Sequence, residues 1–162
     1  MGIHFNADEV FAMAVKIEEN GAAFYRRAGE LHKGSPHAGM LDALARMEDA
    51  HKKIFEDMRR TVPESYKAEQ SFDPYNEAAM YLAAMGDSHG GEGSPAAADR
   101  LTGRETFTDI LDIALELEQT SILYYLGLRD LVPERLGRDK IDVIIGEEKK
   151  HVIQLQTVKS QQ

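Results

Sequence analysis

The chain has 162 residues, 43% of them hydrophobic, a formal net charge of −9 and no cysteine. This composition is typical of a folded protein with a sizeable core, so we expect residues 1–162 to form a single domain. The lack of cysteine excludes a disulfide, a thiolate metal site and an iron–sulfur or rubredoxin-type centre within these residues. The negative charge predicts no nucleic-acid partner, and no apolar run approaches the ~20 residues that span a bilayer. We therefore expect a cytoplasmic protein that contacts neither nucleic acid nor membrane.

Two helices are expected in the first part of the chain, over about 7–32 and about 36–60. Asn6 begins a sequence that resembles a capping box, and apolar residues then recur at helical spacing. Ser35 and Pro36 are typical of an N-cap and a first helical turn, so the second helix is predicted to start there. The short connection makes the two helices an antiparallel hairpin.

The following segment, about 61–104, contains three prolines and several glycines, which predict a long crossover. Within it, residues 76–85 are rich in Ala, Met and Tyr and suit a short helix against the bundle. Residues 90–94 are glycine-rich and are expected to form a loop.

Two further helices are predicted over about 106–130 and about 139–159, with Thr106 as the N-cap of the first. A turn with Pro133 and Gly137 separates them, so they form a second antiparallel hairpin. The expected fold is all-α, an antiparallel four-helix bundle of two helical hairpins joined by the long crossover.

The two hairpins repeat the same polar residues at an offset of one hundred positions. Each has one glutamate on its first helix and a Glu-x-x-His pair on its second, all on otherwise apolar faces. Residues three apart are neighbours on a helix surface, so each pair can point into one cavity. The predicted metal ligands are Glu18, Glu48, His51, Glu118, Glu148 and His151. Four carboxylates and two imidazoles suit two ions of Fe, Mn or Zn, with the carboxylates of the Glu-x-x-His pairs as bridges.

Tyr25 and Tyr125 each follow the first glutamate of their hairpin by seven residues, almost two turns on the same face. Their hydroxyls could therefore hydrogen-bond a ligand carboxylate and orient it. Gly21 and Ser121, one turn from the same glutamates, are small and would leave room near the metals for a small molecule.

The alternative to a metal site is a set of buried ion pairs. Four carboxylates converging on two imidazoles would leave excess negative charge in a low dielectric, which is costly without further cations. The metal interpretation is therefore favoured. Glu147 turns about 100° away from Glu148 and could support a histidine of a neighbouring helix, whereas Met47, at the equivalent position, cannot.

These paired motifs, within residues 10–60 and 105–158, resemble the rubrerythrin branch of the ferritin-like di-iron carboxylate superfamily. The six-ligand set is also similar to that of bacterioferritin. The resemblance implies a ferritin-like bundle whose two iron ions, held by the six residues above, react with hydrogen peroxide or dioxygen. Rubrerythrins carry a further glutamate three residues before the third-helix ligand, where this chain has Leu115.

The leading hypothesis is a di-iron oxidoreductase, a rubrerythrin-like peroxidase or ferroxidase of the oxidative-stress response. An external electron donor protein would restore the ferrous state, and Tyr25 or Tyr125 would orient ligands or pass protons. The alternatives are a non-catalytic iron or divalent-metal buffer and a bundle with purely structural zinc. A bundle of two hairpins with a long linker also favours a homodimer.

Overall fold

The computed structural model describes residues 7–64, 80–81, 84 and 97–162, and the structural statements below concern these residues. No strand occurs among them, so the all-α prediction is confirmed. The long helices lie within about two residues of the predicted ranges at each end. They are α1 (Ala7–Leu31), α2 (Ala38–Thr61), α5 (Phe107–Leu131) and α6 (Arg138–Lys159), with the short 3-10 helices η1 (Ala97–Arg100) and η2 (Glu134–Leu136) before α5 and α6.

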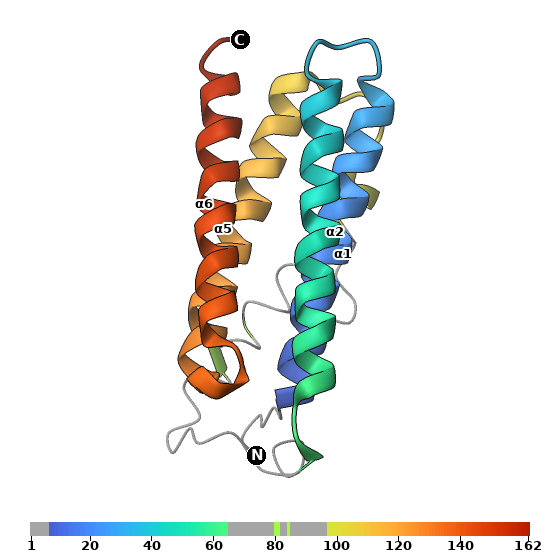
Figure 1. Cartoon of the computed structure of the whole chain (residues 1–162). Coiled ribbons are helices and arrows are strands. Elements are labelled where there is room, and N and C mark those ends of the chain that lie inside the picture. The colour runs from blue at the N-terminus through green and yellow to red at the C-terminus, as the bar shows by residue number, and fades with distance from the viewer. Residues whose placement is uncertain (1–6, 65–79, 82–83, 85–96) are drawn as a thin grey trace.

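The long helices form two antiparallel hairpins that stand side by side, α1 with α2 and α5 with α6 (Figure 1). The chain runs up α1, down α2, down α5 and up α6 in this view. Helices α1 and α5 contact each other. They run in opposite directions, as do the helices of each hairpin. This arrangement is the predicted pair of hairpins, and it decides which residues of α1 and α5 lie level with each other.

The apolar core consists of two clusters, one toward each end of the bundle. One cluster gathers around Phe55, Tyr124 and Ile141 and the other around Phe24, Leu41 and Leu155. The aromatic and branched side chains in both are nearly or fully buried, so they supply most of the hydrophobic stabilisation of the bundle. Along every long helix, the polar residues predicted as ligands lie between the two clusters.

The N-terminal caps test the predicted helix starts. Thr106 accepts a hydrogen bond from the Asp109 amide, and the Asp109 carboxylate accepts one from the Thr106 amide, which confirms Thr106 as the N-cap of α5 and completes a capping box. The prediction for α2 was wrong by two residues. The Ser35 hydroxyl accepts from the amide of His37 and forms a turn, and the helix begins only at Ala38. The predicted cap Asn6 lies outside the described residues.

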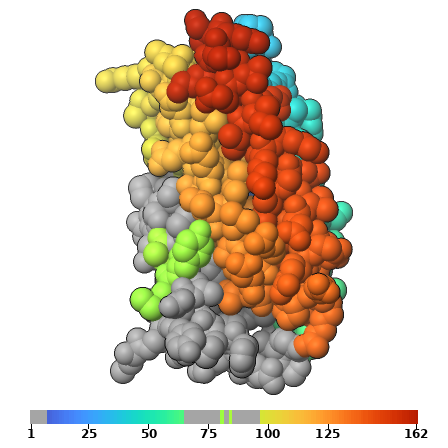
Figure 2. Space-filling view, turned by 90° about the vertical axis from the view of Figure 1, so that its left-hand side faces the viewer, coloured from blue at the N-terminus to red at the C-terminus, as the bar shows by residue number. Residues whose placement is uncertain are grey.

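The connection between the hairpins lies mostly outside the described residues, including most of the predicted short helix at 76–85 and all of the loop at 90–94. Met80, Tyr81 and Ala84 are helical, and the Tyr81 hydroxyl donates to the carbonyl of Leu123 on α5 at 2.6 Å. Figure 2 shows this piece against α5. No helix within the described part of the chain has the length and apolar character needed to cross a membrane.

Candidate metal centre

All four long helices send polar side chains into the middle of the bundle, between the two apolar clusters. These side chains belong to the residues that the sequence predicts as ligands, and each is between 0 and 5% exposed. They are Glu18 on α1, Glu48 and His51 on α2, Glu118 on α5, and Glu148 and His151 on α6. The structure thus brings all six together, as the doubled spacing predicted.

The first group surrounds the imidazole of His51. Its Nδ1 atom lies 2.9 Å from Oε1 of Glu148 and 3.6 Å from Oε2 of Glu18. Glu48 completes this group, whose four ligand atoms all lie within 4.8 Å of one another. The separations suit one ion placed among the four side chains.

The second group surrounds the imidazole of His151 in the same way. Its Nδ1 atom lies 2.9 Å from Oε2 of Glu148, 3.3 Å from Oε2 of Glu118 and 3.6 Å from Oε1 of Glu48. Glu48 and Glu148 belong to both groups. They are the two carboxylates that the sequence predicts as bridges between a pair of metals.

Several of these facing atoms lie close to one another, but among the described residues they make no contact with the geometry of a hydrogen bond. They are Oε2 of Glu18, Oε1 of Glu48, Nδ1 of His51 and both carboxylate oxygens of Glu148. Buried polar groups are almost always paired, because an unpaired one loses its hydration without compensation. Four ionised carboxylates would carry a charge of −4, which two divalent cations would neutralise. The donor set therefore fits two metal ions better than it fits a network of ion pairs.

The pKa values show how the metal-free cluster limits its charge. Burial alone would lower the pKa of His51, but its contacts with Glu148 and Glu18 outweigh burial and raise the pKa to about 11. Glu148 and Glu118 in the same way raise the pKa of His151 to about 9, against the effect of burial. Protonated imidazoles thus supply positive charge near neutral pH, and a metal ion must displace these protons.

The carboxyl groups respond in two directions. Burial is the main cause that raises the pKa of Glu118 to about 8 and that of Glu48 well above its usual range, and neighbouring carboxylates add to both. Burial also acts to raise the pKa of Glu148, but the contacts with His151 and His51 prevail and lower it. Glu148, which lies between the two imidazoles, therefore stays ionised.

The two tyrosines hydrogen-bond ligand carboxylates, but across the bundle. The hydroxyl of Tyr25 donates to Oε1 of Glu118, and that of Tyr125 donates to Oε1 of Glu18. Seven residues correspond to about 10 Å along a helix, so neither hydroxyl reaches back to the glutamate of its own helix. Because α1 and α5 are antiparallel, Tyr25 lies level with Glu118 and Tyr125 with Glu18. The sequence indicated the type of contact, and the helix directions decide the partner.

Gly21 has a role in addition to the predicted one. A Cβ atom on this residue would lie 3.2 Å from Oε2 and 3.3 Å from Cδ of Glu48. The missing side chain therefore makes space for a ligand carboxylate of α2. A glycine inside a long helix is itself a signal of such an approach, because it costs about 1 kcal/mol relative to alanine.

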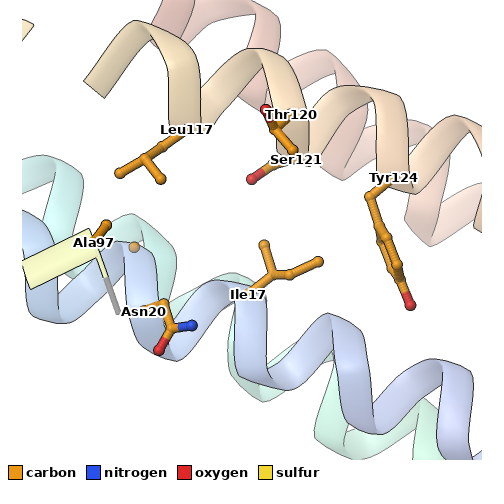
Figure 3. A pocket seen from close by; sticks show the side chains of 8 residues that line it. Ile17, Asn20, Ala97, Leu117, Thr120, Ser121 and Tyr124 are labelled. Atoms are coloured by element: carbon orange, nitrogen blue, oxygen red, sulfur yellow. The ribbon is translucent and has the colours of Figure 1, made fainter. Parts of the chain in front are cut away.

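A small pocket lies between α1 and α5, beside the centre (Figure 3). Its volume is about 30 Å³, and Gly21 and Ser121 are part of its wall, as expected for residues that leave room. Ile17 of α1 and Leu117 and Ser121 of α5 point into the space between the two helices. The pocket is thus large enough for a molecule about the size of water or peroxide. It lies next to Gly21, the residue that packs against Glu48.

The outer nitrogens of the two imidazoles have unlike partners. Nε2 of His51 lies 2.7 Å from Oε2 of Glu147, which confirms the supporting position predicted for that residue. Nε2 of His151 lies 3.4 Å from Sδ of Met47. Met47 has the helical spacing of the buried face of α2, but it is 36% exposed. The sequence predicted that Met47 cannot support a histidine, but its sulfur contacts the ring of His151.

Comparison with known proteins supports the fold. No protein-family model matches the chain, and no curated protein matches it significantly in sequence. A solved structure from Thermotoga maritima is similar over 99% of this chain and 98% of that chain, with a TM-score of 0.69 and 23% sequence identity. That protein is provisionally named a ferritin-like diiron-carboxylate protein. The ferritin-like fold predicted from the sequence is thereby confirmed.

Proposed function

We propose that this chain is a di-metal carboxylate protein that holds two iron ions and acts as an oxidoreductase on hydrogen peroxide or dioxygen. One observation carries the proposal: buried carboxylate and imidazole atoms face one another in two overlapping groups, and five of them make no contact with hydrogen-bond geometry among the described residues. The likeness to a protein named for a diiron-carboxylate centre supports the choice of iron. Manganese and zinc would suit the same donor atoms.

Bound iron would supply the electrons that reduce the oxidant. The residues of the chain would bind the two ions and shield them from solvent. Glu48 and Glu148 belong to both groups and would keep the two ions close together. Tyr25 and Tyr125 each fix one oxygen of a terminal carboxylate and hold a proton at that atom. Burial keeps both tyrosine pKa values well above the usual range, so these hydroxyls remain donors.

The pocket between α1 and α5 would bind the oxidant beside the helix faces that carry Glu18 and Glu118. Its apolar lining admits a small uncharged molecule such as peroxide or dioxygen more readily than an ion. The chain has no cysteine for a redox centre of its own, so we propose that an external electron donor protein reduces the metals after each reaction.

A second function, metal buffering without turnover, is favoured by Leu115. This residue precedes Glu118 by three positions on α5, belongs to the apolar cluster around Phe24, Leu41 and Leu155, and is largely buried. It occupies the position at which rubrerythrins have an additional carboxylate, so the centre has six candidate ligands among the described residues.

Rapid mixing separates the two functions. The protein is loaded with two equivalents of ferrous iron without oxygen and then mixed with hydrogen peroxide or dioxygen. An oxidoreductase is expected to show ferric absorption within seconds and renewed reaction after each reduction. A metal buffer would take up and release the ferrous ions reversibly, with no oxidation faster than that of free iron. A Glu148→Ala variant, which lacks the carboxylate common to both groups, is the matched control.

A further inference from the structure

The two halves of the centre are alike in almost every contact. Both imidazoles face the carboxylates with Nδ1 and lie stacked, with their ring centres 5.9 Å apart. Both terminal glutamates accept a hydrogen bond from a tyrosine of the opposite helix. A difference in strength between the two metal positions therefore has to come from outside these shared contacts.

The outward side of each imidazole provides such a difference. Glu147 presents a carboxylate oxygen at hydrogen-bond distance from Nε2 of His51. Met47, which stands at the equivalent place in the other hairpin, presents a thioether sulfur to Nε2 of His151. A carboxylate is a strong acceptor with a negative charge, whereas a thioether sulfur is neutral and accepts weakly.

The consequence for a metal ligand follows from the tautomer. When Nε2–H donates to Glu147, the lone pair of Nδ1 on His51 is held toward the cluster and is made more basic by the nearby charge. The Met47 contact fixes the His151 ring less firmly and adds no charge. Removing a carboxylate partner from a metal-bound histidine typically costs about 10–100-fold in metal affinity.

We propose that the two metal positions are unequal: Glu147 makes the His51 position the tighter one, and Met47 leaves the His151 position weaker and exchangeable. The centre then fills first at His51 and loses its ion first at His151. This inference rests on the proposed function, because it requires that the six residues bind two metals. Glu147 acts here as a positioning residue through His51.

Titration of the metal-free protein with Co²⁺, followed by calorimetry and by the visible absorption of the ion, tests the order. Two binding steps at least about tenfold apart in affinity are expected for the unchanged protein. Glu147→Gln should weaken the first step by about 10–100-fold and make the two steps merge. Met47→Glu should instead strengthen the second step. Glu134→Gln, which removes a similar charge on the exposed η2 segment, should change neither step.

The position of the first ion provides an independent measurement. Crystals grown with one equivalent of Co²⁺ should show the stronger anomalous peak beside His51, and circular dichroism should show that each variant is folded. Equal affinities in the unchanged protein, or a first step that Glu147→Gln leaves unaltered, would overturn the inference while the di-metal centre stands. No binding of Co²⁺ by the unchanged protein would overturn the proposed function itself.

Discussion

Replacing Gly21 with alanine sets two effects of known size against each other. In a helix interior, alanine is more favourable than glycine by about 1 kcal/mol, which corresponds to about 2–4 °C in the melting temperature of a domain of this size. The new Cβ, however, would lie 3.2 Å from Oε2 of Glu48, a contact so close that the carboxylate must move by a few tenths of an ångström. The metal-free protein is therefore expected to change little in stability.

Metal binding should respond much more strongly. Metal–ligand distances are normally kept within about 0.2 Å, so a displaced Glu48 is a poorer ligand. Because Glu48 belongs to both groups, Gly21→Ala should weaken both metal positions, by at least about tenfold each. This outcome differs from that of Glu147→Gln, which should affect one position only.

The chain offers a matched control at Gly146 in α6, where an added Cβ would meet nothing within 4 Å. Gly146→Ala should raise the free energy of unfolding by about 1 kcal/mol and leave both metal affinities unchanged. The measurements are thermal or urea unfolding of the metal-free proteins and Co²⁺ titration of each. If Gly21→Ala binds two ions as tightly as the unchanged protein, the assigned contact between residue 21 and the ligand carboxylate is wrong.

Three further predictions use the same measurements. Tyr25→Phe should lower the stability of the metal-loaded protein by about 1.5–3 kcal/mol, since the carboxylate of Glu118 loses its hydrogen-bond donor. The hydroxyl of Tyr124 donates to a backbone carbonyl, so the control Tyr124→Phe should leave metal affinity unchanged. The raised pKa values of His51 and His151, about 11 and about 9, mean that the folded metal-free protein binds these protons more tightly than the unfolded chain. Their stabilisation is complete below about pH 6.5 and is lost as the pH rises through about 9 and then about 11, so the melting temperature should fall over that interval. Thr106→Ala should cost about 1 kcal/mol in unfolding experiments without altering metal titration, because it removes the cap of α5 far from the centre.

The doubled spacing carried most of what the sequence could predict. The short connections between helical segments predicted the hairpins. Glutamates and Glu-x-x-His pairs on apolar faces predicted the six residues that meet in the centre, because residues three apart share a helix face. Spacing within one helix cannot, however, show how two helices are aligned. The exchange of partners between Tyr25 and Tyr125 depends on the antiparallel register of α1 and α5, which only the assembled bundle reveals.

Other predictions differed from the structure because one local sequence pattern is compatible with two structures. A serine followed by proline is compatible with a helix cap and with a turn, and Ser35 forms the turn. Small residues are compatible with an open space and with a close contact, and Gly21 has a pocket on one side and Glu48 on the other. Met47 has helical spacing that fits the buried face of α2, but it is partly exposed.

The metal content of the protein shows whether the six residues bind two ions. The protein is purified without added metal, stripped with a chelator, dialysed against ferrous iron without oxygen or against Mn²⁺ or Zn²⁺, and analysed for metal per chain. We expect two ions per chain for at least one of these metals and fewer than two for Glu148→Ala, which lacks a carboxylate that both groups contain. A stripped protein that is folded and takes up none of these ions would contradict this expectation.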